Sequence, residues 1–150
     1  MNVDHGTFTI EKIIAASPAN VFRAFAEEEL KRQWFVHPGL SSSEYSLDFG
    51  PRGREAGRFV LDEGPGAGVH ENATTYLDVV EGERISYAYS MAWDGRVHSA
   101  SLVTVTFAPT EAGCKLTVTE QGAHFPPSDG PEMRRGGIEA QLDALVALFA

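Results

Sequence analysis

The stretch PEMRRGGIEAQLDALVALFA, residues 131 to 150, decides the fold because it is the one long amphipathic helix that the sequence predicts. Its apolar residues follow the 3.6-residue period of a helix with a single buried stripe; they are Ile138, Leu142, Leu145, Val146 and Phe149. Asp129 followed three residues later by Glu132 resembles a capping box, and Pro131 suits the first turn. We therefore expect a helix of about 28 Å that starts near Pro131.

Two adjacent glycines, Gly136 and Gly137, interrupt this amphipathic pattern. Each costs a helix interior about 1 kcal/mol relative to alanine. The pair therefore indicates a kink, a close packing contact or an opening beside the helix.

The rest of the chain reads mostly as strands. TFTIEKIIAA alternates with the two-residue period of a half-buried strand, and SPANVFRAF follows as a helix with Ser17 as N-cap and Pro18 at its first position. EEELKRQWF reads as a second short helix. Six further strands follow between glycine-rich and proline-rich turns; they are SEYSLDF, GRFVL, ENATTYLDVV, RISYAYSMAW, ASLVTVTFAP and CKLTVTEQ.

The tight turns between consecutive strands predict an antiparallel meander, because parallel neighbours need long crossovers. Such an open sheet has an apolar face that must be covered. We therefore expect an α+β fold in which a curved antiparallel sheet of six or seven strands grips the C-terminal helix, with two short helices after the first strand. At 150 residues, the chain has the usual length of one domain, spanning 1–150.

Composition narrows the functional classes. The net charge of −9 would repel phosphate backbones, which argues against nucleic-acid binding. No apolar run is long enough to insert into a membrane, and the first residues do not resemble a secretory signal. Cys114 is the only cysteine in the sequence, which fits a reducing compartment. We expect a cytoplasmic protein.

The order of elements resembles the START-like, helix-grip (SRPBCC) superfamily. The segments that carry the resemblance are IIAASPANVFRAFAEEELKRQWF, GREAGRF, VVEGERISYAYSMAW, LVTVTFAPTEAGCKLTVTEQG and GGIEAQLDALVALF. Within the superfamily the chain is similar to the family named for the activator of the heat-shock chaperone ATPase. The resemblance implies a cavity between sheet and helix and, by family habit, a homodimer. Relatives often have Gly-Trp where this chain has Gly136-Gly137, and threonine where it has Cys114.

Two strands supply candidate pocket residues. In RISYAYSMAW, the residues Tyr87, Tyr89, Met91 and Trp93 share one face. They serve equally well as pocket lining and as core under the helix. In CKLTVTE, the residues Leu116, Val118 and Glu120 share a face, which makes Glu120 the candidate for a polar group inside the cavity; a strand-end carboxylate that reaches solvent is the alternative. Ile138, Leu142 and Leu145 complete the predicted pocket, and Trp34 either gates it or anchors the second short helix.

Metal and nucleophilic chemistry find little support in the sequence. His70 and Glu71 are adjacent on a strand and point to opposite faces. His37, His98 and His124 are predicted near turns, without metal-ligand spacing. There is no nucleophile elbow, and GPGAG lacks the lysine of a phosphate loop. We expect neither a metal nor another cofactor.

Three functional hypotheses remain. The first is a module that binds a small hydrophobic or amphipathic molecule, such as a lipid, under the C-terminal helix. The second is an enzyme of the cyclase or hydrolase type in which Glu120, as a weak candidate catalytic residue, or a histidine moves protons. The third, suggested by the family name, is a co-chaperone-like stress protein. A binding role is favoured over an enzyme.

Overall fold

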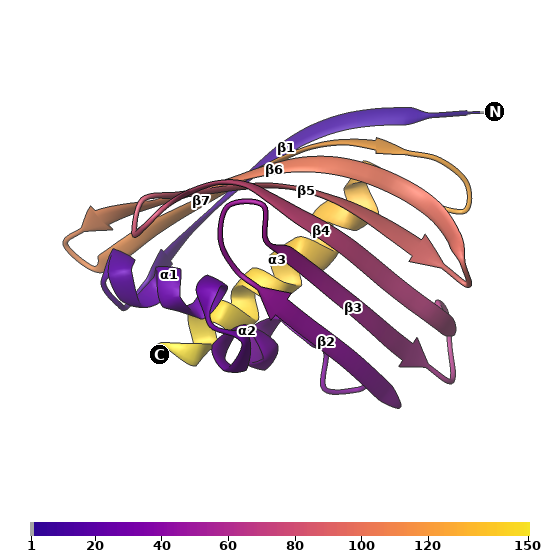
Figure 1. Ribbon diagram of the computed structural model, residues 1–150, viewed down its shortest axis with the longest axis horizontal. Helices are drawn as coiled ribbons and strands as arrows, with labels where there is room; N and C mark the ends of the chain where they lie inside the picture. Colours follow the sequence, from indigo (N-terminus) through magenta and orange to yellow (C-terminus); the bar gives the residue numbers. More distant parts are fainter. Residues whose placement is uncertain (1) are drawn as a thin grey trace.

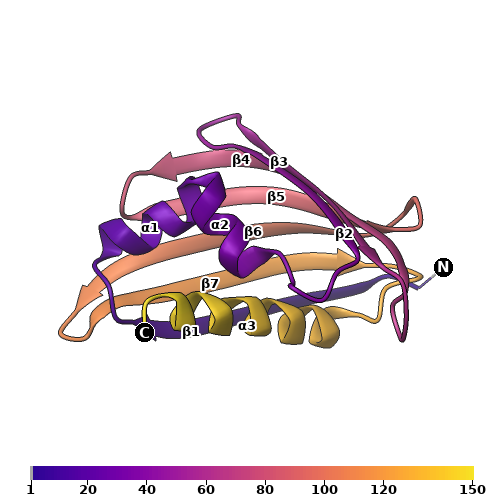
Figure 2. The same ribbon diagram turned by 90° about the horizontal axis from the view of Figure 1, so that it is seen from below.

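The computed structural model describes residues 2–150, which form one curved sheet with helices on a single face (Figures 1 and 2). The helices are α1 (Pro18–Ala26), α2 (Glu28–Phe35) and α3 (Pro131–Leu148). The strands are β1 (Asp4–Ile14), β2 (Ser42–Asp48), β3 (Arg54–Leu61), β4 (Gly68–Val80), β5 (Arg84–Trp93), β6 (Arg96–Thr110) and β7 (Gly113–His124).

The seven strands are antiparallel throughout, in the order β1-β7-β6-β5-β4-β3-β2. Strands β2 to β7 follow one another as a meander, while β1 pairs with β7 at the edge. This confirms the predicted α+β helix-grip fold, with seven strands. None of the helices within residues 2–150 is long and apolar enough to span a membrane.

The local signals at the start of α1 are confirmed. Ser17 is the N-cap, and its side chain accepts a hydrogen bond from the Asn20 amide at 3.2 Å. Pro18 occupies the first turn, where no amide donor is required. The predicted strand face at β1 is also confirmed, since Phe8, Ile10 and Ile14 are buried.

The capping box predicted for α3 is wrong. Pro131 begins the helix as expected, but its N-cap is Gly130, whose positive φ of 96° favours glycine. Glu132 is therefore one position too early to reach back as a capping-box residue. The side-chain hydrogen bond at this helix start comes from Ser128 instead, whose hydroxyl accepts from the Gly130 amide at 3.0 Å.

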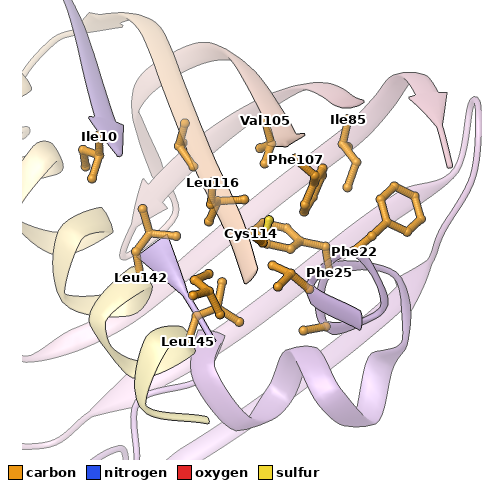
Figure 3. Packing of buried hydrophobic residues seen from close by; sticks show 14 of the residues in the cluster. Ile10, Phe22, Phe25, Ile85, Val105, Phe107, Cys114, Leu116, Leu142 and Leu145 are labelled. Atoms are coloured by element: carbon orange, nitrogen blue, oxygen red, sulfur yellow. The ribbon is translucent and has the colours of Figure 1, made fainter. Parts of the chain in front are cut away.

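Helix α3 covers only the part of the sheet near the β1 edge, and its position there determines where the candidate site lies. It packs against β1, β7 and α2, as Figure 2 shows. Leu142 and Leu145 are its buried residues, and they join Ile10 and Leu116 in the core (Figure 3). The middle strands therefore pack little against α3, and the cavity lies between them and the helices.

Helix α1 and the last turn of α2 close the other end of the core. Phe22 and Phe25 each meet Phe107 of β6 edge to face, with ring centroids 5.3 and 5.4 Å apart. Trp34 lies 4.8 Å from Phe25 and donates its indole N–H to the Ala24 carbonyl at 2.9 Å. Cys114 is fully buried beside them, as expected for a thiol without a histidine next to it.

Candidate functional site

A cavity of about 670 Å³ occupies the space between the middle of the sheet and the helices. Its floor comes from β3 to β7, one side from α3, and the other from α2 and the loop that follows it. Most of its wall is aromatic and aliphatic. A hollow on the opposite face of the sheet is bordered by exposed side chains, among them Glu44, Arg58 and Glu71.

The structure places seven of the eleven residues in the predicted pocket on this wall: Trp34, Tyr87, Tyr89, Met91, Val118, Ile138 and Leu142. Trp34 also anchors α2 through its indole hydrogen bond to the Ala24 carbonyl, which is one of the two roles considered for it. The alternation along β5 explains why its three large residues lie together, since every second side chain faces the helices.

The other four residues lie outside the wall: Trp93, Leu116, Glu120 and Leu145. Leu116 and Leu145 are fully buried in the hydrophobic core. Trp93 stacks on His70 at a ring separation of 5.5 Å, and its indole N–H donates to the Ala67 carbonyl at 3.1 Å. It therefore supports the β3–β4 loop. Glu120 lies behind Tyr89, away from the open space.

Glu120 is the centre of a hydrogen-bonded cluster at one end of the cavity. The Tyr89 hydroxyl donates to both carboxylate oxygens, at 2.8 and 2.9 Å, and the Ser101 hydroxyl donates at 2.9 Å. Arg134 of α3 brings its guanidinium within 3.5 Å of the same carboxylate. Glu120 is 1% exposed. The strand-end alternative, in which it reaches solvent, is therefore wrong, because β7 continues to His124 and its inner face is covered there.

Arg134 connects this cluster to α3. Besides Glu120, it donates to the Tyr89 hydroxyl at 2.9 Å and to the Ser99 hydroxyl at 2.7 Å. The first half of α3 is thus fastened to β5, β6 and β7 by one side chain. Burial raises the pKa of Tyr89, and the Glu120 carboxylate raises it further, so the phenol stays protonated and donates.

A second buried ion pair, Lys31 with Glu55, lies at the α2 end of the cavity. Their side chains are 4% and 2% exposed. The remaining capacity of the Glu55 carboxylate is used by Tyr45, Asn72 and Thr74. Burial alone would raise the pKa of Glu55, but the Lys31 ammonium and these donors outweigh it, so its pKa is lowered.

The two clusters together determine the charge that the cavity offers to a ligand. Each cationic side chain on the wall, Lys31 or Arg134, already has a buried carboxylate within an ion-pair distance. Between them the wall is mostly apolar, and its remaining carboxylate, Asp129, is exposed to solvent. Such an arrangement suits an apolar body with hydrogen-bonding ends, which is the usual composition of a small-molecule site.

His98 enters the cavity because of a β-bulge. In the pairing of β5 with β6, Met91 opposes Ser99 and Ala92 opposes Val97, so His98 is the extra residue. Without a bulge, His98 would face away from Ser99; instead both lie on the inner side, and Val97 remains exposed outside. Burial, and then Arg134 and His70, lower the pKa of His98.

Two of the histidines predicted near turns, His98 and His124, do lie beside turns, but within strands and with their side chains turned inward. His98 is part of β6, and His124 is the last residue of β7, with 3% exposure. Burial lowers the pKa of His124 as well. Its Nδ1 lies 3.3 Å from the Ser128 hydroxyl. Within residues 2–150, no group of three or more histidine, cysteine or acidic side chains is arranged to hold a metal ion.

Sequence reasoning missed several wall residues that carry polar chemistry. They are Lys31, Glu55, His70, Asn72, His98 and Arg134. One signal was available: Glu55 and Asn72 each fall on the apolar face of an alternating strand, as Glu120 does. The bulge that turns His98 inward has no marker in RVHSA, since it depends on how two strands pair.

Comparisons with known proteins agree with this architecture. Residues 15–150 match the model of the family described as activator of Hsp90 ATPase homolog 1-like protein. None of the curated proteins matches the chain.

Solved structures of similar proteins include one from Rhizobium leguminosarum, which is 36% identical, with 99% of this chain and 96% of that chain covered and a TM-score of 0.88. The Mll3558 protein from Rhizobium loti is 39% identical over 98% of this chain and 99% of its own, with a TM-score of 0.87. Protein CV1439 from Chromobacterium violaceum is 26% identical, with 95% of this chain and 96% of that chain covered and a TM-score of 0.77.

Proposed function

This chain belongs to the activator of Hsp90 ATPase homolog 1-like family, and we propose that it binds a small apolar or amphipathic molecule in the cavity between the sheet and α3. The observation that carries the proposal is the cavity itself. Its volume of about 670 Å³ lies within the range of roughly 300–1,000 Å³ for small-molecule sites. Its wall combines rings such as Tyr87 with the flexible Met91, which adapts to ligand shape.

The environment of Glu120 favours binding over catalysis by this residue. Its oxygens accept from Tyr89 and Ser101 and face Arg134, so the carboxylate holds α3 in place. A general base must reach the proton that it removes. Glu120 does not line the cavity, and the Tyr89 hydroxyl contacts both of its oxygens, which supports a structural role for it.

The experiment is a titration of the whole chain with 2-naphthol, an uncharged two-ring molecule, followed by methyl NMR. The inner-face methyl groups of Met91, Val118 and Ile138 should shift with one saturable binding curve. The methyl groups of Leu77 and Leu102, which are 54% and 40% exposed, provide the control. Leu77 and Leu102 should not respond. Absence of any shift, or shifts that are confined to the exposed methyls, would refute the proposal.

A further inference from the structure

Gly137 contributes to the cavity wall, whereas its neighbour Gly136 does not. Both lie in the interior of α3, which continues through them from Pro131 to Leu148. Apart from its chain neighbours and the backbone of its own helix, a Cβ atom built on either glycine would meet no atom of the described residues within 4 Å, and neither has the positive φ that favours glycine. Close packing therefore explains neither glycine. Of the three interpretations of the glycine pair (a kink, a close packing contact or an opening beside the helix), we retain the opening for Gly137.

The position of Gly137 on the helix defines which part of the cavity it leaves open. Side chains on a helix lean toward its N-terminus and cover the preceding turn. A side chain at 137 would therefore lie over Met133 and Arg134, and both of these residues line the cavity. Any substituent there would take space beside the Arg134 cluster.

We propose that Gly137 sets the size of the ligand: the space that its missing side chain leaves beside Met133 and Arg134 admits a ligand of three or more fused rings. This inference rests on the proposed binding function. A cavity of about 670 Å³ is large for a one-ring or two-ring molecule and fits a drug-sized body. Filling the space at 137 should exclude large ligands and retain small ones.

The test compares Nile red, an uncharged dye with several fused rings, with the smaller 2-naphthol on three proteins: the wild type, Gly137→Leu and Gly136→Leu. In Gly137→Leu, the affinity for Nile red should fall by roughly tenfold or more, because added methylenes in an apolar pocket discriminate by 10–200-fold. Its affinity for 2-naphthol should change by less than about threefold, since the remaining volume still holds two rings. Gly136→Leu should bind both probes as the wild type does.

Folding is checked separately through melting temperatures. Replacing either glycine by alanine removes the same helix penalty, so Gly136→Ala and Gly137→Ala should each raise Tm by roughly 2–4 °C. If the affinity for Nile red falls equally in both leucine variants, or in neither, the assignment to Gly137 is overturned while the proposed function stays intact. If the wild type binds neither probe, the proposed function fails and this inference fails with it.

Discussion

Lys31 and Glu55 are the most deeply buried opposite charges in direct contact among the described residues, with side chains 4% and 2% exposed. Removing one partner of such a pair leaves an uncompensated charge in a medium of low polarity. We expect Lys31→Met to lower the free energy of unfolding by about 3–5 kcal/mol at neutral pH, measured by urea denaturation.

The matched control is Lys12→Met, which removes an ion pair of Lys12 with Glu139 and Asp143 that is partly exposed. It should cost less than about 1 kcal/mol. The difference in free energy of unfolding between Lys31→Met and the wild type should also become smaller as pH falls. In the wild type, the lowered pKa of Glu55 gives stability above the ordinary value of 4.5 that is lost in acid. Equal effects of the two variants would contradict this account.

His98 makes stability depend on pH in the neutral range. Its pKa is lowered from 6.5 by burial and by Arg134, so the unfolded chain binds a proton more readily than the folded chain does. Stability should therefore fall as pH decreases from about 7.5 to about 5.5. His98→Phe should weaken this dependence, leaving the part that His124 contributes through its own lowered pKa, and should leave stability above pH 7 nearly unchanged. A variant with the same slope as the wild type would show that other groups cause it.

At the scale of the element, Arg134 fastens the first half of α3 to three strands. Arg134→Met would leave Glu120 buried without its cation, so we expect faster amide hydrogen exchange over residues 131–138 and a loss of about 3–5 kcal/mol. Arg135→Met is the control, because Arg135 lies 5.9 Å from the ring centroid of Phe8 and takes no part in the cluster. Equally fast exchange in both variants would contradict this account, because it would mean that the Arg134 cluster does not determine the local stability of residues 131–138.

The sequence predicted the elements well because their signals are local. Alternation along β5, the N-cap Ser17 and the stripe of α3 each depend on residues within a few positions of one another. The predicted capping box at the start of α3 was wrong because it, too, was read from local spacing. Asp129 and Glu132 have the spacing of a capping box, but Gly130 adopts a positive φ that the spacing does not reveal.

At the scale of the whole molecule, element order was sufficient to predict the fold, while the site depends on distances between elements. The stripe of α3 predicts burial of Leu142 and Leu145, but not that the helix lies over β1 and β7. That lateral position determines where the cavity lies and leaves Leu116 and Leu145 in the core. It also places Arg134 beside Glu120, two residues that no local sequence pattern connects.

The charge of the whole molecule and the pairing inside the cavity predict which ligands it selects. The chain carries a net charge of −9, and the cations on the wall, Lys31 and Arg134, are already paired. An anionic ligand would meet long-range repulsion and would bury an uncompensated carboxylate. We therefore expect 2-naphthol to bind at least about tenfold more tightly than 2-naphthoate, which has the same rings, in isothermal titration calorimetry.

Two comparisons separate the long-range part of this preference from the local part. Raising the salt concentration screens the net charge, so the gap between the two ligands should narrow without closing. Glu120→Gln removes the charge that pairs with Arg134 and replaces no residue of the cavity wall. It should strengthen binding of 2-naphthoate selectively, since the freed guanidinium can then pair with the ligand. Tighter binding of 2-naphthoate to the wild type would show that the charges in the cavity are not balanced by their buried partners.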